Sequence, residues 1–150
     1  MDIENLEELF KYIVSESVRL KNKYLENEVS IEFADVFSKD DKEYTRLTQE
    51  IKSIGKIVYT TPTGDIYELT KPIDTVAGKL RYGKIRKPDN KLQLRGDADF
   101  NSDYKKLKER YLEKPHFELI VREKFEMLRL SDPDFGVMSC FSNIPVRKWI

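Results

Sequence analysis

Two short stretches of this chain read as copies of each other, and this constrains the fold more than any single motif. The first, 33–37, reads FADVF and leads to YTRL at 44–47; the second, 97–101, reads DADFN and leads to YKKL at 104–107. Coincidence is the alternative in a chain rich in Asp, Lys and Tyr. The order of predicted elements also matches over both halves, which favours an internal duplication.

The first half begins with a helix predicted over residues about 3–26. Its apolar residues recur at helical spacing, with Glu and Lys between them. They are Leu6, Leu9, Phe10, Ile13, Leu20 and Tyr24. A strand over 31–37 follows, and then a helix that Asp40 or Asp41 can cap and that Gly55 ends. Three further strands are predicted, at 56–60, 66–69 and 79–86.

The second half repeats this order without the leading helix. A strand is predicted over 96–101, then a helix capped by Ser102 and broken by Pro115, then strands at 117–122, 125–130 and 137–142. We therefore expect an α+β fold in which two βαβββ modules form a curved mixed sheet around a cleft. One domain, 1–150, would comprise the N-terminal helix at 1–26, a first module at 27–90, and a second module with the C-terminal tail at 91–150.

The amino-acid composition indicates the compartment in which the protein is expected. The 150 residues suffice for one hydrophobic core, and 27 basic residues balance 27 acidic ones, so no global charge recruits nucleic acid or membrane. Cys140 is the only cysteine, which fits a reducing compartment. The acidic start lacks the pattern of a secretion signal, and no apolar run approaches the roughly 20 residues of a membrane helix. We expect a cytoplasmic protein without membrane contact.

The repeated strands also predict where a site lies. Side chains alternate between the two faces of a strand. The small or apolar residues Ala34, Val36, Ala98 and Phe100 suit the face on which a helix packs. The opposite face would present Asp35, Asp97 and Asp99 to a cavity shared by the two halves.

With this element order, and with the motifs at 33–37, 43–55 and 96–100, the chain resembles the glyoxalase-like vicinal oxygen chelate superfamily over about residues 27–143. It looks most like a branch that carries an extra N-terminal helix. The resemblance implies paired βαβββ modules that enclose a cleft, and often pairing of modules between chains, so a homodimer is an expected assembly.

The resemblance also implies a metal held by His, Gln or Glu on the first and last strands of each module. Here the first-strand positions are Phe33 and Asp97, and the closing strands, 79–86 and 137–142, contain neither a carboxylate nor a histidine. Asp97 is thus the remaining candidate metal ligand. The cofactor prediction is either none or a divalent metal ion.

Other potential sites have ordinary explanations. Residues Asp97, Asp99, Asn101 and Asp103 are spaced like the start of a calcium loop, but Ser102 and Lys108 stand where the motif needs Gly and Glu. A strand followed by a helix cap explains the same residues. His116 has no partner at metal-ligand spacing and is expected at the surface, and Cys140 is expected to be a buried thiol.

The segment 79–95 carries seven basic residues and one acidic residue. In a cleft, such residues can bind a carboxylate or phosphate. On an outer surface they can meet nucleic acid, or serve only as a solvated sheet edge. These alternatives stay open at this point.

Two functions follow. In the first, a small anionic molecule binds in the cleft against Arg81, Lys84, Arg86 and Asn101. Asp35, Asp97 and Asp99 are then the candidate catalytic carboxylates of a lyase- or isomerase-type enzyme. In the second, a non-catalytic binding module uses the basic segment to meet nucleic acid or a protein partner. Whether the protein is an enzyme, and which ligand or reaction is involved, cannot be read from the residues.

Overall fold

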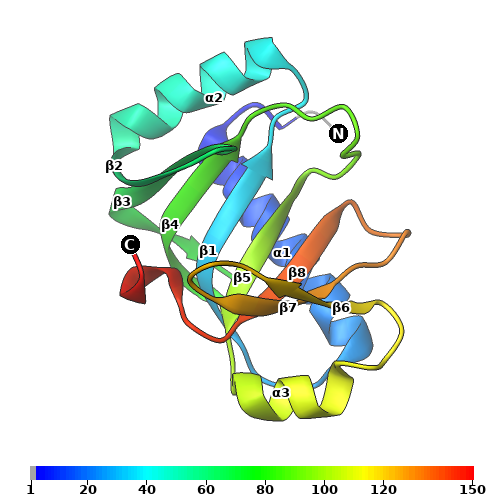
Figure 1. Cartoon of the computed structure of the whole chain (residues 1–150). Helices are drawn as coiled ribbons and strands as arrows, with labels where there is room; N and C mark the ends of the chain where they lie inside the picture. Colours follow the sequence, from blue (N-terminus) through cyan, green and yellow to red (C-terminus); the bar gives the residue numbers. More distant parts are fainter. Residues whose placement is uncertain (1–2) are drawn as a thin grey trace.

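The computed structural model describes residues 3–150, and over this range each half of the chain has the predicted order of elements (Figure 1). Helix α1 (Leu6–Tyr24) comes first. The first half then contains β1 (Ser30–Phe37), α2 (Asp41–Ile54), β2 (Gly55–Thr61), β3 (Gly64–Thr75) and β4 (Gly78–Arg86). The second half contains β5 (Gly96–Asn101), α3 (Tyr104–Tyr111), β6 (Phe117–Val121), β7 (Glu126–Leu130) and β8 (Val137–Ser142), followed by the 3₁₀ helix η1 (Val146–Lys148).

The strands form one curved mixed sheet in the order β2-β3-β4-β1-β5-β8-β7-β6. Strands β1 and β5 pair antiparallel at its centre, and each pairs parallel with the last strand of its own half. Ala34 lies opposite Ala98, its counterpart in the repeat. An approximate two-fold axis therefore passes between these two alanines, and the predicted α+β fold with two βαβββ modules is confirmed.

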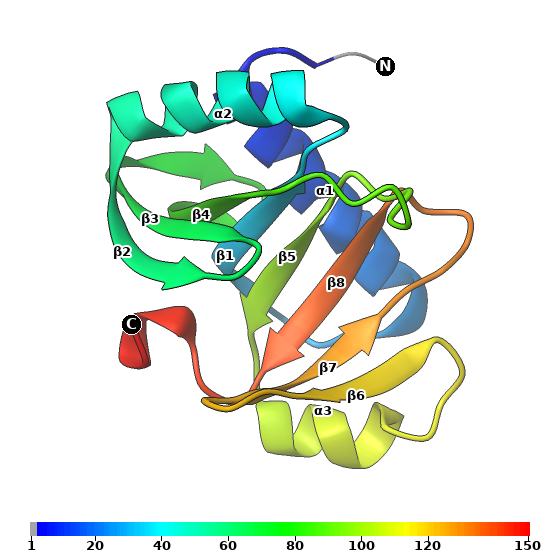
Figure 2. The same ribbon diagram turned by 45° about the horizontal axis from the view of Figure 1, so that its top comes forward.

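Helix α1 covers one face of the sheet, behind the central strands in Figure 2. Its apolar side meets Ala34 and Ala98, both fully buried. The close approach depends on glycine. A Cβ atom on Gly83 would lie 2.6 Å from Phe10 Cζ, and one on Gly96 would lie 2.7 Å from Ile13 Cδ1. The helix thus fixes which face of β1 and β5 is left for a site.

Helices α2 and α3 begin at aspartates. The Asp40 side chain accepts a hydrogen bond from the Glu43 amide at 2.8 Å, as predicted. At α3 the cap is Asp103, whose side chain accepts from the Lys106 amide, so the prediction of Ser102 as the cap is wrong. The Asp103 carboxylate lies three residues before the amide it caps, and Ser102 is one residue too early.

A partly buried ion pair joins the start of α2 to the loop before β5. The Arg95 guanidinium donates two hydrogen bonds to the Glu43 carboxylate, at 2.7 and 3.0 Å, and a third to the Phe37 carbonyl at 2.8 Å. This paired, forked geometry satisfies both charges in a poorly solvated position. It links the two halves at the end of β1.

Other boundaries differ from the predicted ones. Strand β3 continues past Leu69 to Thr75, because the proline at 72 falls where the β3–β4 register shifts and needs no ladder hydrogen bond there. Helix η1, within the predicted C-terminal tail, was not predicted. No helix within residues 3–150 is both long and apolar enough to cross a membrane.

Candidate functional site

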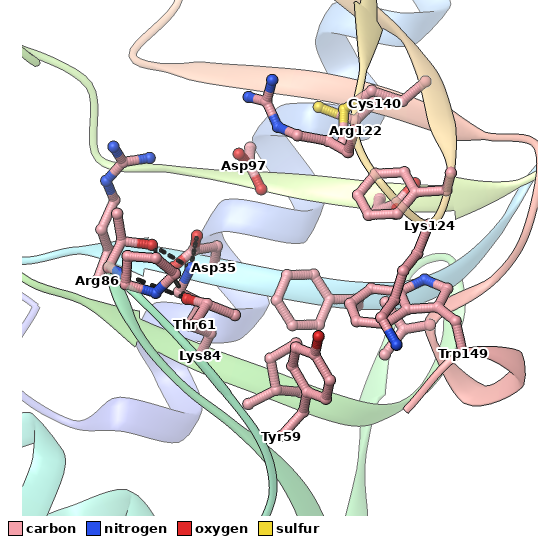
Figure 3. Close-up of a pocket in the computed structure, with 18 of the residues that line it drawn as sticks. Asp35, Tyr59, Thr61, Lys84, Arg86, Asp97, Arg122, Lys124, Cys140 and Trp149 are labelled. Atoms are coloured by element: carbon pink, nitrogen blue, oxygen red, sulfur yellow. Dashed lines mark hydrogen bonds and ion pairs between the residues drawn. The ribbon is translucent and has the colours of Figure 1, made fainter.

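A pocket of about 510 Å³ lies on the sheet face opposite α1 and takes residues from both halves (Figure 3). All three predicted carboxylates, Asp35, Asp97 and Asp99, line it. Lys84 and Arg86 of β4 line it as well. The face assignment made from the alternation of β1 and β5 therefore brings these five side chains together.

The pocket floor consists of two rows of side chains that cross the sheet. The register of the strands defines each row, and every member lines the pocket. The first row is Tyr59, Ile66, Lys84, Asp35 and Asp97. The second row is Phe33, Asp99, Cys140 and Arg129. Each row combines residues of both modules, so neither module forms the site alone.

Asp35 is the most constrained carboxylate of the first row. Burial and the facing Asp97 carboxylate raise its pKa well above the usual value, and Lys84 partly offsets this. The Lys84 ammonium lies 3.9 Å from one Asp35 oxygen. The other oxygen, Oδ1, is buried and has no hydrogen-bond partner among the described residues. Burying an acceptor without a partner is costly, which agrees with the raised pKa of Asp35.

The other two carboxylates differ in acidity. Burial raises the pKa of Asp97 to about 6, against the opposing effect of Arg129 and the β4 cations. Burial raises the pKa of Asp99 to about 8, although Ser142 donates a hydrogen bond of 2.7 Å to its Oδ2 atom. Asp99 Oδ1 is also buried without a partner among residues 3–150. Near neutral pH the two groups therefore hold different protonation states.

Lys84 is held in place from the side opposite the carboxylates. Its ammonium donates a hydrogen bond to the Thr63 hydroxyl. Burial lowers the pKa of Lys84, and Asp35 opposes that effect. Cys140 is buried in the same pocket, as predicted, and burial raises the pKa of its thiol well above the usual value. The thiol is thus an uncharged part of the pocket lining.

Two predicted ligand-binding residues do not reach the pocket. Arg81 is exposed and absent from the lining. Asn101 lies at the end of β5, where its amide donates to Ser30 Oγ at 3.3 Å and to Glu32 Oε1 at 3.2 Å. Arg81 falls one residue out of phase with Lys84 and Arg86, so strand alternation places it on the other face.

The pocket also has an aromatic and basic wall that the sequence did not reveal. Its aromatic members are Tyr59 of β2, Phe125 of the β6–β7 turn, and Trp149 of the C-terminal tail. Further cations at the same wall are Arg122, Lys124 and Arg129. The sequence RxKF at 122–125 could have indicated this wall, because a turn that combines cations with an aromatic residue can contact a ligand.

The residues fit a metal centre poorly. Among residues 3–150, no group of three or more His, Cys, Asp or Glu side chains is arranged to hold a metal ion. The calcium-loop alternative is wrong, because Asp97, Asp99 and Asn101 lie on strand β5 and Asp103 caps α3. His116 is exposed, with its ring 5.0 Å from the ring of Tyr24, and it does not line the pocket.

No family model matches the chain, and no curated protein matches it. Among solved structures the chain is similar to "Structural Genomics, Protein EC4020", with 12% identity, a TM-score of 0.69, and coverage of 99% of this chain and 96% of that chain. A second structure, the integron cassette protein HFX_CASS4 from the mobile metagenome of the Halifax Harbour sewage outfall, gives 14% identity and a TM-score of 0.28, with coverage of 77% of this chain and 98% of that chain. The first similarity shows a shared α+β fold over nearly the whole chain.

Proposed function

We propose that the protein binds a small anionic organic molecule in the pocket between its two modules and moves a proton on it, as a lyase- or isomerase-type enzyme. The observation that carries the proposal is the pair of buried, unpartnered carboxylate oxygens of Asp35 and Asp99. Burying such atoms is costly unless something bonds to them. Asp35 lies 3.9 Å from the Lys84 ammonium, and both carboxyl groups line a pocket of a size that suits small ligands.

The charge of the lining supports an anionic ligand. Five basic side chains line the pocket: Lys84, Arg86, Arg122, Lys124 and Arg129. The acidic lining residues are Asp35, Asp97, Asp99 and Glu123. Burial raises the pKa of Asp99 to about 8, so Asp99 carries a proton near pH 7, and the pKa of Asp35 is raised as well. The site is then positive and attracts a carboxylate or phosphate.

The acidities of Asp97 and Asp99 support proton transfer. Asp97, with a pKa of about 6, is mostly ionised at pH 7 and acts as the base that removes a proton from carbon next to the anionic group. Asp99, with a pKa of about 8, is mostly protonated and acts as the acid that returns one. Two carboxyl groups whose environments separate their pKa values are a recurring arrangement for acid–base chemistry.

We further propose that the chain is a divergent member of the glyoxalase-like vicinal oxygen chelate superfamily. The paired modules and their shared pocket support this placement. A divalent ion at Asp97 is the less favoured version of the site, because Lys84 and Arg129 supply the neighbouring charge that a metal would supply. A homodimer and a cytoplasmic location stay predictions of the sequence.

The binding-module alternative draws less support from the geometry. Its basic segment does not present one continuous surface, because Lys84 and Arg86 line the pocket and Arg95 pairs with Glu43. Lys79, at the start of the segment, pairs with Asp74 at 2.8 Å. Nucleic-acid or protein binding through 79–95 therefore stays an untested prediction.

Calorimetric titration with acetate, phenylacetate and inorganic phosphate tests anion binding. We expect Arg86→Gln to weaken the binding of whichever anion the wild type takes by about tenfold or more, since a charged hydrogen bond contributes about 1.5–3 kcal/mol. Arg81→Gln is the matched control: it removes the same charge from the same strand, but outside the pocket. Equal weakening by both variants, or no binding by the wild type, would reject the proposal.

Deuterium incorporation tests the proton transfer. A panel of 2-oxo and 2-hydroxy acids is incubated with protein in D₂O and followed by proton NMR. We expect exchange at the carbon next to the carboxyl or carbonyl group of a bound acid, and loss of that exchange in Asp97→Asn. If acids bind but their carbon-bound protons never exchange, anion binding would stand and the proposed proton transfer would be rejected.

A further inference from the structure

Three aromatic rings form one side of the pocket, and they come from distant parts of the chain. The Trp149 ring stacks on Phe125, with centroids 5.3 Å apart and planes at 15°. Tyr59 meets the same Trp149 ring edge-on, with centroids 5.2 Å apart and planes at 87°. The Lys124 ammonium lies 5.3 Å from the centroid of the Tyr59 ring. We call these three rings the aromatic wall.

The aromatic wall depends on a C-terminal tail that is fixed to the sheet. The buried Glu32 carboxylate accepts the Arg147 amide at 3.0 Å and also binds the Arg147 guanidinium. The Asn101 amide donates to the same carboxylate. Val146 is buried beside it. Glu32 therefore holds the tail so that Trp149 faces the pocket, and Asn101 supports this contact although it does not reach the ligand.

Two of the basic lining residues lie on the other side of the pocket. In Figure 3, Lys84 and Arg86 lie opposite Tyr59 and Trp149. The register gives the spacing: Tyr59 and Lys84 belong to one row with one strand between them, so their backbones are about 10 Å apart. A molecule with a ring at one end and an anionic group at the other spans such a distance.

We infer that the ligand carries a flat aromatic ring, held by Tyr59 and Trp149, and a carboxylate or phosphate directed to Lys84 and Arg86. This inference rests on the proposed function and names its substrate class. Aromatic pairs gain about 0.5–1.5 kcal/mol beyond the burial of their area. A wall made only to exclude water could be aliphatic, whereas this one presents stacking faces and edges together with a cation.

The test compares four probes that vary the ring and the charge separately: acetate, cyclohexylacetate, phenylacetate and 2-phenylethanol. Phenyl phosphate, added as a fifth probe, distinguishes a phosphate from a carboxylate ligand. Trp149 is the only tryptophan of the chain, so its fluorescence reports occupancy directly, and calorimetry gives the affinities. We expect phenylacetate to bind about three- to tenfold more tightly than cyclohexylacetate, and 2-phenylethanol to bind weakest of the ring compounds.

Variants of the C-terminal tail distinguish a specific effect of the Trp149 ring from a general loss of folding. Trp149→Leu should remove the preference for phenyl over cyclohexyl while acetate binds as before, and Trp149→Phe should keep that preference. Arg147→Ala, which frees the tail without touching the ligand, should weaken phenylacetate more than acetate. The melting temperature of each variant shows that the fold is retained.

Equal affinity for phenylacetate and cyclohexylacetate in the wild type would overturn the inference. Anion binding that is lost in Arg86→Gln would still stand in that case, so the proposed function would survive. A wild-type protein that binds none of the anions would reject both.

Discussion

Asp35 of β1 lies directly opposite Asp97 of β5, on the pocket side of the central strand pair. Cβ atoms of residues so paired are about 4.5–5.5 Å apart, and like charges at this position repel. The repulsion adds to burial in raising the pKa of Asp35. Asp35 is therefore a weaker acid than an ordinary aspartate.

Replacing Asp97 should make Asp35 more acidic. In Asp97→Asn the repulsion disappears and Lys84 remains, so the pKa of Asp35 should fall. Carbon-13 NMR of the Asp35 carboxyl group across a pH titration measures this. Asp99→Asn is the matched control and should leave the Asp35 value nearly unchanged; an equal fall in both variants would contradict the pairing.

Stability should fall as the pH rises from about 5 to 8.5. Asp99 titrates near 3.8 when unfolded and near 8 when folded, so between these values the folded state binds more protons than the unfolded state. The free energy of unfolding therefore decreases through this window. Asp97, with a folded pKa of about 6, adds a smaller slope in the same direction over its lower part.

Urea denaturation at pH 5.5 and pH 8.5 measures this slope. Asp99→Asn should flatten it, because the amide has no proton to lose. Asp132→Asn is the comparison variant, since ion pairing with Lys23 and a hydrogen bond from Tyr24 lower the pKa of Asp132, and its titration lies below the window. A slope that is unchanged in Asp99→Asn would show that the carboxyl group is not protonated in the folded state.

Gly83 is required for the contact between α1 and the sheet. In Gly83→Ala the new Cβ atom would lie 2.6 Å from Phe10 Cζ, so the ring must move, and we expect a loss of roughly 1–3 kcal/mol in the free energy of unfolding. Gly136→Ala meets nothing within 4 Å and should change stability little. Guanidinium denaturation distinguishes the two, and a neutral Gly83→Ala would mean that α1 can shift at low cost.

The Arg95–Glu43 pair should contribute far more to the free energy of unfolding than a surface pair does. Arg95→Met leaves the Glu43 carboxylate buried without its main partner, with an expected loss of about 3 kcal/mol. Lys106→Met breaks an exposed pair with Asp103 and should cost less than about 1 kcal/mol. Thermal melting compares them, and equal effects would show that Glu43 reaches solvent once Arg95 is removed.

Most of the architecture could be predicted from the repeat. The alternation of side chains along a strand and the order of helices and strands both follow from local sequence. The pattern at 33–37 and 97–101 placed Ala34 and Ala98 toward a helix and Asp35, Asp97 and Asp99 toward a pocket, and the strand register agrees. The covering helix is α1, which lies outside the repeat. The end of β3 was missed because proline discouraged a strand that a register shift accommodates.

The aromatic wall was not predictable by the same means. Tyr59 and Trp149 are 90 positions apart and meet only because Glu32 fixes the tail. Nothing in the local pattern at 144–150 indicates where that tail lies. Arg81 was placed wrongly for a different reason: it was chosen by charge alone, although its position in the strand already put it on the opposite face from Lys84.

The axis between Ala34 and Ala98 has a consequence for how a ligand can enter. Two identical halves would offer every ligand two equivalent orientations, related by that axis. In this chain the equivalent positions have diverged, with Phe33 matched by Asp97 and Lys84 by Cys140. Because the two sides of the pocket differ in this way, we expect an unsymmetrical molecule to bind in a single orientation.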